Sequence, residues 1–267
     1  MKGAILQYDP AYLDVERNLA AVDGLIDSLD ADLLVLPELF AAGYFFKSSE
    51  DLRSVAETAD GRTVEQLKAW SRDKNAVIVA GFPELTASGI YNSAAVVSPQ
   101  GLVGVYRKVH LFYREKELFQ PGDLGFPVFD VKDRNGEPYR LGVMICFDWY
   151  FPESARSLAL SGADVIAHPS NLVRKDCPRS MPIRALENHV FTVTANRVGG
   201  EESDGELLTF IGQSLACDPA GEVLCSFTRE GVGVETFSFD PKTSRNRDIT
   251  ATNNLFGDRR AEVYRLA

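Results

Sequence analysis

The sequence has few of the residues that cross-link small secreted proteins or bind metal clusters. Four cysteines and three histidines occur in 267 residues. The cysteines show neither CxxC spacing nor the density of a disulfide scaffold, and they stand at Cys146, Cys177, Cys217 and Cys225. The histidines show no metal-ligand spacing. We therefore expect no bound metal and a reducing, cytoplasmic environment.

Long apolar segments and an excess of basic charge are also missing. No run approaches the roughly 20 apolar residues of a membrane helix, and the start MKGAILQYDP lacks the apolar region of a signal peptide. The 38 acidic side chains outnumber 28 basic ones, and a net charge of -10 repels nucleic acids and anionic membranes. Neither a P-loop nor a dinucleotide fingerprint occurs. We expect no cofactor and no nucleic-acid or membrane partner.

Short apolar runs typical of buried strands occur along most of the chain. Helical periodicity lies between some of them, from Asp14 to Leu29 and in ESARSLALSG after Pro152. The order begins β-α-β-α, passes through a mostly β middle, returns to β-α-β-α and ends in strands. No linker or internal repeat interrupts it. The sequence therefore predicts a layered α/β chain with one domain over residues 1–267.

Three of the expected strands end in side chains that are able to do chemistry. Glu38 follows the run LLVLP, Lys108 follows GLVGVYR, and Cys146 ends the run GVMIC. The carboxyl ends of strands are where α/β sheets usually place ligand sites. Each residue alone also has an ordinary interpretation, as a solvated glutamate, a surface base or a core cysteine. Alternation puts Lys108 and Arg107 on opposite faces, so one of them must leave bulk solvent.

Taken together, the motifs PELF, YRKVHLF and VMICFDWYFPESAR closely resemble the nitrilase superfamily of carbon–nitrogen hydrolases. YNSAAVVSPQG, HPSNLV and MPIRALENHVFTVTANRVG extend the resemblance over almost the whole chain, which looks most similar to the prokaryotic amidase and carbamoylase-like branches. The resemblance implies a four-layer α-β-β-α sandwich and assembly into a homodimer or larger homo-oligomer. The last roughly 25 residues are a candidate oligomerisation tail.

The resemblance also implies a catalytic role for each of the three residues. Cys146 would attack the substrate carbon and form a thioester, and Glu38 would act as general base. Lys108 would stabilise the oxyanion together with the backbone N–H of Phe147. A second glutamate after the lysine would position it; Glu115 is the best match and Glu117 is the near competitor.

Candidate substrate-binding residues surround these groups. They are Phe147, Tyr44, Phe112, Trp149 and Asn171. Aromatic residues beside buried strands are more often part of the core, so that alternative stays open. Arg174 and Arg179 are able to bind a substrate carboxylate or to face solvent.

The predicted reaction is hydrolysis of a small amide or N-carbamoyl substrate, with release of ammonia or an amine. True nitrilases usually have Trp-Glu after the cysteine, whereas this chain has Phe147 and Asp148, which favours an amide. An aliphatic nitrilase is the alternative, because the same thiol adds to either group. A thiol redox protein, which needs Cys146 but neither Glu38 nor Lys108, and an inactive binding relative are more remote alternatives.

Overall fold

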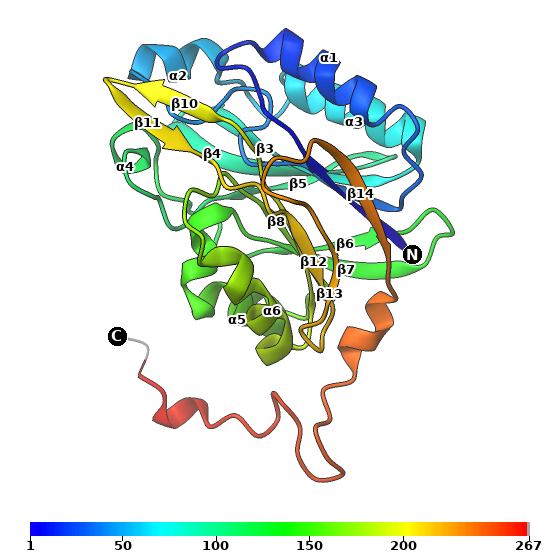
Figure 1. The fold of residues 1–267 in the computed structure, drawn as a ribbon. Helices are drawn as coiled ribbons and strands as arrows, with labels where there is room; N and C mark the ends of the chain where they lie inside the picture. The colour runs from blue at the N-terminus through cyan, green and yellow to red at the C-terminus, as the bar shows by residue number, and fades with distance from the viewer. Residues whose placement is uncertain (266–267) are drawn as a thin grey trace.

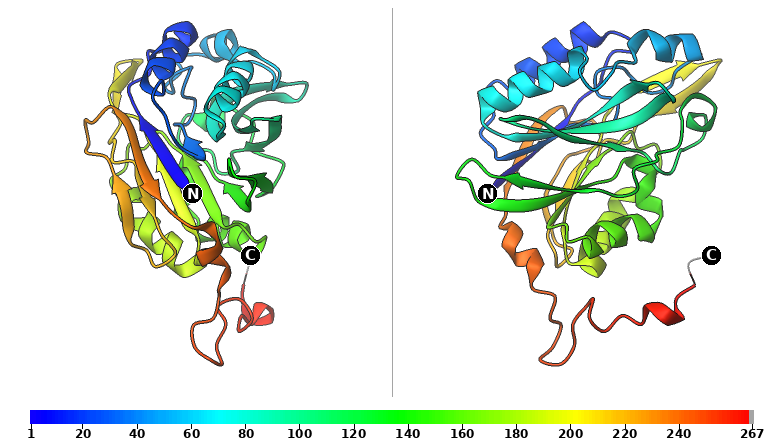
Figure 2. Two further views of the ribbon diagram at one scale, coloured as in Figure 1. Left: turned by 90° about the vertical axis from the view of Figure 1, so that its right-hand side faces the viewer. Right: turned by 180° about the vertical axis from the view of Figure 1, so that it is seen from behind.

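Two six-stranded sheets pack face to face in the computed structural model, which describes residues 1–265 (Figures 1 and 2). The first sheet consists, in spatial order, of β14 (Gly233–Ser238), β1 (Lys2–Gln7), β2 (Leu33–Val35), β3 (Val77–Thr86), β4 (Gly89–Ser98) and β5 (Gly101–Arg107). The second consists of β13 (Val223–Ser226), β12 (Leu215–Cys217), β9 (Phe191–Ala195), β8 (Val165–Pro169), β7 (Pro138–Val143) and β6 (Val128–Lys132). A separate hairpin joins β10 (Gly200–Ser203) to β11 (Glu206–Thr209).

Helices cover the outer face of each sheet, so the predicted α-β-β-α layering is confirmed (Figure 1). The α-helices are α1 (Val15–Leu25), α2 (Ser49–Val55) and α3 (Arg62–Lys74) on the first side, then α4 (Glu115–Leu118) after β5, and α5 (Pro152–Leu160) and α6 (Cys177–Asn188) over the second sheet. Three short 3₁₀ turns complete the elements: η1 (Cys146–Tyr150), η2 (Pro241–Arg245) and η3 (Ala261–Val263). No helix in residues 1–265 is long and apolar enough to cross a membrane.

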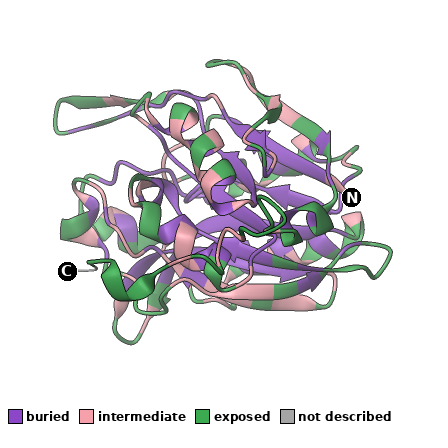
Figure 3. Cartoon of the chain, turned by 90° about the horizontal axis from the view of Figure 1, so that it is seen from below, coloured by how far each residue is buried: buried purple, intermediate pink, exposed green. Residues whose placement is uncertain are grey.

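The central strands are continuous apolar runs because both of their faces are covered. Successive residues of β2 and β3 alternate between two cores. Leu33, Val35, Val77 and Val79 belong to the core that the two sheets share, whereas Leu34, Ile78 and Ala80 pack in the core beneath α1 and α3. Figure 3 shows this burial along the strands.

The helix ends follow local side-chain chemistry. The Asp14 side chain accepts a hydrogen bond from the N–H of Arg17, as expected of an N-cap. The expectation that this helix reaches Leu29 is wrong: α1 ends at Leu25, because the chain turns after Ile26 to enter β2. Pro152 begins α5, where its missing N–H costs no helical hydrogen bond.

The strands that carry the candidate residues all end at one edge of the sandwich. β1, β2 and β3 run parallel, and so do β7, β8 and β9. β5 runs parallel to β3, because each is antiparallel to β4. The carboxyl ends of β2 and β5 therefore lie at one edge of the first sheet, and the hydrogen bond from Asn171 to Glu38 joins the end of β8 to that edge. This is where α/β sheets usually place their ligand sites.

Candidate active site

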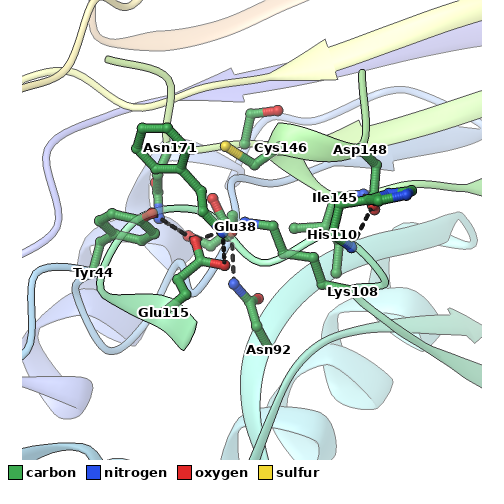
Figure 4. Close-up of polar contacts among 12 residues, drawn as sticks. Glu38, Tyr44, Asn92, Lys108, His110, Glu115, Ile145, Cys146, Asp148 and Asn171 are labelled. Atoms are coloured by element: carbon green, nitrogen blue, oxygen red, sulfur yellow. Dashed lines mark hydrogen bonds and ion pairs between the residues drawn. The ribbon is translucent and has the colours of Figure 1, made fainter. Parts of the chain in front are cut away.

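The turn after β7 presents Cys146 at this edge. The strand ends at Val143, Met144 still donates its N–H to Ala167 of β8, and η1 then begins at Cys146. Cys146 has φ 42°, in the left-handed region that side chains other than glycine rarely occupy. Such strain persists where the surroundings hold it, commonly at functional sites. The turn leaves Cys146 5% exposed, beside the residues that follow β2 and β5 (Figure 4).

Close backbone packing fixes the position of Glu38. A Cβ atom on Gly81 of β3 would lie 2.6 Å from the Glu38 Cα and 2.5 Å from the Leu39 nitrogen. Glycine at this point of β3 therefore lets the loop after β2 lie directly on the sheet. From the opposite sheet, Asn171 Nδ2 donates to the Glu38 carbonyl at 2.9 Å. Both sheets thus hold the glutamate.

Lys108 lies between two buried carboxylates. Its Nζ donates to Glu38 Oε1 and to Glu115 Oε1, each at 2.7 Å. Asn92 of β4 donates to the same Glu38 oxygen at 2.7 Å. The Glu38 and Lys108 side chains have no exposed surface, and that of Glu115 is 4% exposed. Arg107 takes the opposite direction and pairs with Glu84, as strand alternation predicts.

The second oxygen of the Glu38 carboxylate is free. Oε2 is buried and has no hydrogen-bond partner among residues 1–265. Buried carboxylate oxygens are usually paired, so an unpaired one is a functional signal. Since Lys108 and Asn92 occupy Oε1, Oε2 is the atom of Glu38 that is available to take a proton.

Burial and charge set the protonation of the thiol and the lysine. Burial, together with the negative charge of Glu38, raises the pKa of Cys146 well above its ordinary range despite Lys108. Burial alone would lower the pKa of Lys108, but Glu115 and Glu38 outweigh it and raise that pKa. The resting site therefore holds a thiol and an ammonium group at neutral pH.

A hydrogen-bond network behind the turn holds its backbone in place. The buried Asp148 carboxylate accepts from Tyr106 Oη at 2.6 Å and from the N–H of Ile145 at 2.9 Å. It also contacts the N–H and Nδ1 of His110, at 3.1 and 2.8 Å. Because Ile145 and Asp148 flank the strained residue Cys146, these bonds stabilise the turn.

His168 contacts the carbonyl group of Cys146. Burial lowers the pKa of His168 to about 4, so the ring is neutral at pH 7. Its Nε2 lies 2.9 Å from the Cys146 carbonyl oxygen, which only accepts, so Nε2 carries the proton. Nδ1 then accepts from Thr194 Oγ1 at 3.0 Å.

The candidate pocket residues occupy different places. Tyr44 is buried and donates to Glu115 Oε1 at 2.5 Å, which brings it to the site. Phe112 and Phe147 are partly buried, with ring centroids 5.1 Å apart. Trp149 is buried in the same hydrophobic core as residues of α5 and α6, so its role at a pocket stays a prediction.

Exposure and hydrogen-bond partners distinguish Glu115 from Glu117 and show the environment of Arg174. Glu117 is exposed, whereas Glu115 contacts Lys108 directly. Arg174 pairs with Asp176 at 2.7 Å on the surface. Within residues 1–265, no group of three or more His, Cys, Asp or Glu side chains is arranged to hold a metal ion.

Comparison with known proteins identifies the family. Residues 2–246 match the family model described as carbon-nitrogen hydrolase. The chain belongs to this family. The carbon–nitrogen hydrolase is 50% identical to a protein named nitrilase from Pyrococcus abyssi, over 99% of each chain. It is also 37% identical to an (R)-stereoselective amidase from a Pseudomonas species, over 84% of this chain and 78% of that one.

Solved structures confirm the resemblance to the nitrilase superfamily. The fold of this carbon–nitrogen hydrolase is similar to that of an amidase from Nesterenkonia sp. AN1, with a TM-score of 0.78. The two chains are 26% identical over 98% of this chain and 94% of the other. That structure is of a glutamate-to-glutamine variant and shows covalent addition of the acetamide moiety of fluoroacetamide at the active site cysteine.

Two polar residues of the carbon–nitrogen hydrolase site were not predicted from the sequence. Asn92 contacts Glu38, and His168 contacts the Cys146 carbonyl, but neither was a candidate. A signal was present in each case: both are polar residues inside apolar strand runs, where an unpaired polar group is costly. Their partners come from other strands, which sequence spacing does not reveal.

Glu115 makes the stability of the hydrolase depend on pH. Burial raises its pKa from the ordinary 4.5 to about 7, although Lys108 opposes this. The folded state therefore keeps a proton that the unfolded chain loses, and the free energy of unfolding falls as pH rises through this range. We expect Glu115→Gln to flatten this fall, measured by urea unfolding at about pH 5 and about pH 7. The matched control is Glu117→Gln in the same helix, which should keep the wild-type slope; equal slopes for all three proteins would contradict the prediction.

Proposed function

We propose that this protein hydrolyses a carbon–nitrogen bond of small amide or N-carbamoyl substrates through a thioester on Cys146. The free Oε2 of Glu38 carries the proposal, because a buried thiol with a raised pKa needs a base beside it. Lys108 holds the other oxygen of that base and stays charged. A buried nucleophile, base and cation are what hydrolysis of an unreactive amide requires.

In the first half-reaction, Glu38 takes the thiol proton while the sulfur attacks the substrate carbon. The carbonyl π electrons move onto the oxygen, and Lys108 and the backbone N–H of Phe147 stabilise that oxyanion. No backbone carbonyl in residues 1–265 accepts from the Phe147 N–H, which leaves it available for this purpose. The intermediate then collapses, the carbon–nitrogen bond breaks, and Glu38 returns the proton to the leaving amine.

In the second half-reaction, water replaces the amine. Glu38 Oε2 takes a proton from water as the oxygen attacks the thioester, and the same two donors stabilise the second oxyanion. Collapse breaks the carbon–sulfur bond, and the Cys146 sulfur recovers its proton from Glu38. The products are a carboxylic acid and ammonia or an amine, or a carbamate in place of the acid from an N-carbamoyl substrate. Glu115 positions Lys108 throughout.

The residues near the thiol favour an uncharged substrate. The Phe147 ring, next in sequence to Cys146, contacts two other rings, with centroids 5.1 Å from Phe112 and 5.5 Å from Tyr150. Contact between aromatic rings and apolar groups of a substrate is favourable, because it removes apolar surface from water. A charged acyl group would lose its hydration there, which costs free energy. We therefore propose that Phe112, Phe147, Asn171 and the ring of Tyr44, whose hydroxyl is engaged by Glu115, bind the substrate.

Nitrile hydrolysis is the second candidate function. The relative named nitrilase, at 50% identity, supports it. The same thiol adds to a nitrile carbon, with Lys108 and Glu38 beside the nitrogen. Phe147 and Asp148 after the nucleophile favour the amide.

Ammonia release over a panel of substrates tests the proposal. The panel contains short aliphatic monoamides, N-carbamoyl amino acids and short aliphatic nitriles, at equal concentration and neutral pH. We expect the largest kcat/KM for an uncharged amide. Turnover confined to nitriles would contradict the amide assignment, and no turnover of any member would contradict the proposed function.

We also propose that the chain acts as one hydrolase domain in a cytoplasmic homodimer or larger homo-oligomer. Leu160 of α5 and Ile183 and Leu186 of α6 are 43 to 51% exposed, a cost that a second copy would remove. The tail through residue 265 lies on the side of α5 and α6 (Figure 1), and residues 266–267 lie outside the described part. A monomeric mass in sedimentation velocity would contradict this assembly.

A further inference from the structure

A buried ion pair lies beside the site, and the proposed chemistry does not use it. Arg197, in the loop after β9, has no exposed side-chain surface. It pairs with Glu201 of β10 and, at 2.8 Å, with Asp9. The guanidinium also lies 4.1 Å from the centre of the Phe210 ring. Two carboxylates and an aromatic ring therefore surround the Arg197 guanidinium.

Glu201 reaches from this pair to the loop that carries Tyr44. Its Oε2 accepts from the N–H of Tyr44 at 2.9 Å and from the N–H of Phe45 at 2.6 Å. The approach is close: a Cβ atom on Gly43, which has φ +86°, would lie 2.9 Å from Glu201 Oε1. Glycine at this position allows both the turn and the contact.

Tyr44 continues the connection to the lysine. Its hydroxyl donates to Glu115 Oε1, the same atom that accepts from Lys108 Nζ. Buried contacts therefore join Arg197 to Lys108, through Glu201, Tyr44 and Glu115. The connection joins distant parts of the sequence, since Glu201 and Tyr44 are 157 positions apart.

The hairpin β10–β11 also touches the segment before α4. Arg114 Nη1 donates to Ser203 Oγ at 3.0 Å, and Tyr113 Oη donates to Glu206 Oε2 at 2.8 Å. The hairpin lies over this segment (Figure 1). It thus contacts both chain segments that position Glu115.

A buried ion pair is weak evidence for stability, because desolvation offsets much of the attraction between the charges. Its value lies in fixing geometry, since a half-satisfied pair is costly and one arrangement is favoured. We infer that Arg197 and Glu201 are positioning residues for the hydrolytic reaction, which act on Lys108 through Tyr44 and Glu115. This inference rests on the proposed roles of Lys108 and Cys146, and it adds the hairpin to the elements on which turnover depends.

A double-mutant cycle tests the inference. Glu201→Gln keeps the shape but places an amide against Arg197, and Tyr44→Phe removes the hydroxyl that contacts Glu115. We expect each variant to lower kcat about 10-fold with KM changed less than about 2-fold, as for other residues that orient catalytic groups. Because both act through one connection, the double variant should be no slower than the slower single variant.

The pH profile separates positioning from a general structural effect. The Tyr44 hydroxyl lowers the pKa of Glu115, so its loss or displacement raises that pKa. The limb of the kcat/KM profile that follows Glu115 should therefore move to higher pH in Glu201→Gln and Tyr44→Phe. The matched control is Glu202→Gln, one position along β10 and exposed, which should keep the wild-type profile.

Two outcomes would overturn the inference: wild-type kcat in a folded Glu201→Gln protein, or losses that multiply in the double variant. If Glu201→Gln does not fold, Arg197→Lys replaces it in the cycle. Wild-type kcat in a folded Arg197→Lys protein would then overturn the inference. Cys146→Ala is measured in parallel. Activity that survives in Cys146→Ala contradicts the proposed function, whereas an inactive Cys146→Ala beside an unaffected Glu201→Gln contradicts the positioning role alone.

Discussion

Replacing Cys146 with alanine is expected to lower kcat/KM by about 10⁴-fold or more, because the acyl group then has no nucleophile to accept it. The neighbouring groups do not replace the thiol. Burial and adjacent carboxylates keep Tyr44 protonated, and Lys108 stays an ammonium ion. Ammonia release from the best amide measures the loss, and intact mass after brief incubation with substrate should show no adduct.

The chain provides a matched control for this variant in Cys177→Ala. Cys177 is a free, fully buried thiol in α6, and burial raises its pKa as it does that of Cys146. It lies outside the group of Glu38, Lys108 and Cys146, so this variant should lose packing but keep kcat. Glu38→Gln retains the thiol and should slow turnover while trapping an adduct on Cys146. Turnover that survives in Cys146→Ala, or that disappears equally in Cys177→Ala, would contradict the assignment.

Much of the sandwich could be predicted because its strands are buried on both faces. The apolar run GAILQY overlaps β1 except for Lys2, and the runs DLLVLP and DVIAHPS contain β2 and β8. These strands are apolar throughout because each sheet is covered on both faces, by the other sheet and by helices. The hairpin β10–β11 was not predicted, since its residues are mostly exposed and its strands have four residues each. A signal was present in Asp204 and Gly205, which both have positive φ, as a tight hairpin turn requires.

The site residues could be predicted only where an apolar strand is followed by a reactive or charged side chain. Glu38, Lys108 and Cys146 carry that signal, and strand direction brings their loops together. The residues that hold them come from other parts of the sequence: Asn92 lies within β4, and Glu201 contacts Tyr44, 157 positions away. No spacing rule joins such partners, because tertiary packing alone places them side by side.

Replacing Lys108 with methionine is expected to destabilise the protein by about 3–5 kcal/mol, because two buried carboxylates lose their shared counter-charge. In the variant, Glu38 Oε1 keeps only Asn92 and Glu115 Oε1 keeps only Tyr44. The oxyanion also loses a charged donor, which lowers kcat by about 10²–10³-fold. Urea unfolding at neutral pH measures the stability, and ammonia release measures the activity. The control, Lys116→Met, removes an exposed lysine, and we expect its stability to change by less than about 0.5 kcal/mol.

A second substitution separates the two effects of Lys108. Adding Glu115→Gln to Lys108→Met removes one of the two stranded charges, so part of the lost stability should return. Activity should not return, because the donor to the oxyanion is still absent. The recovery should also depend on pH, since Glu115 in the single variant can be protonated at low pH, whereas the glutamine side chain of the double variant needs no proton. Lys108→Met should therefore lose least stability at acid pH. A Lys108→Met protein as stable as wild type would show that the lysine does not hold the carboxylates together, and a double variant that regains turnover would show that Lys108 does not stabilise the oxyanion.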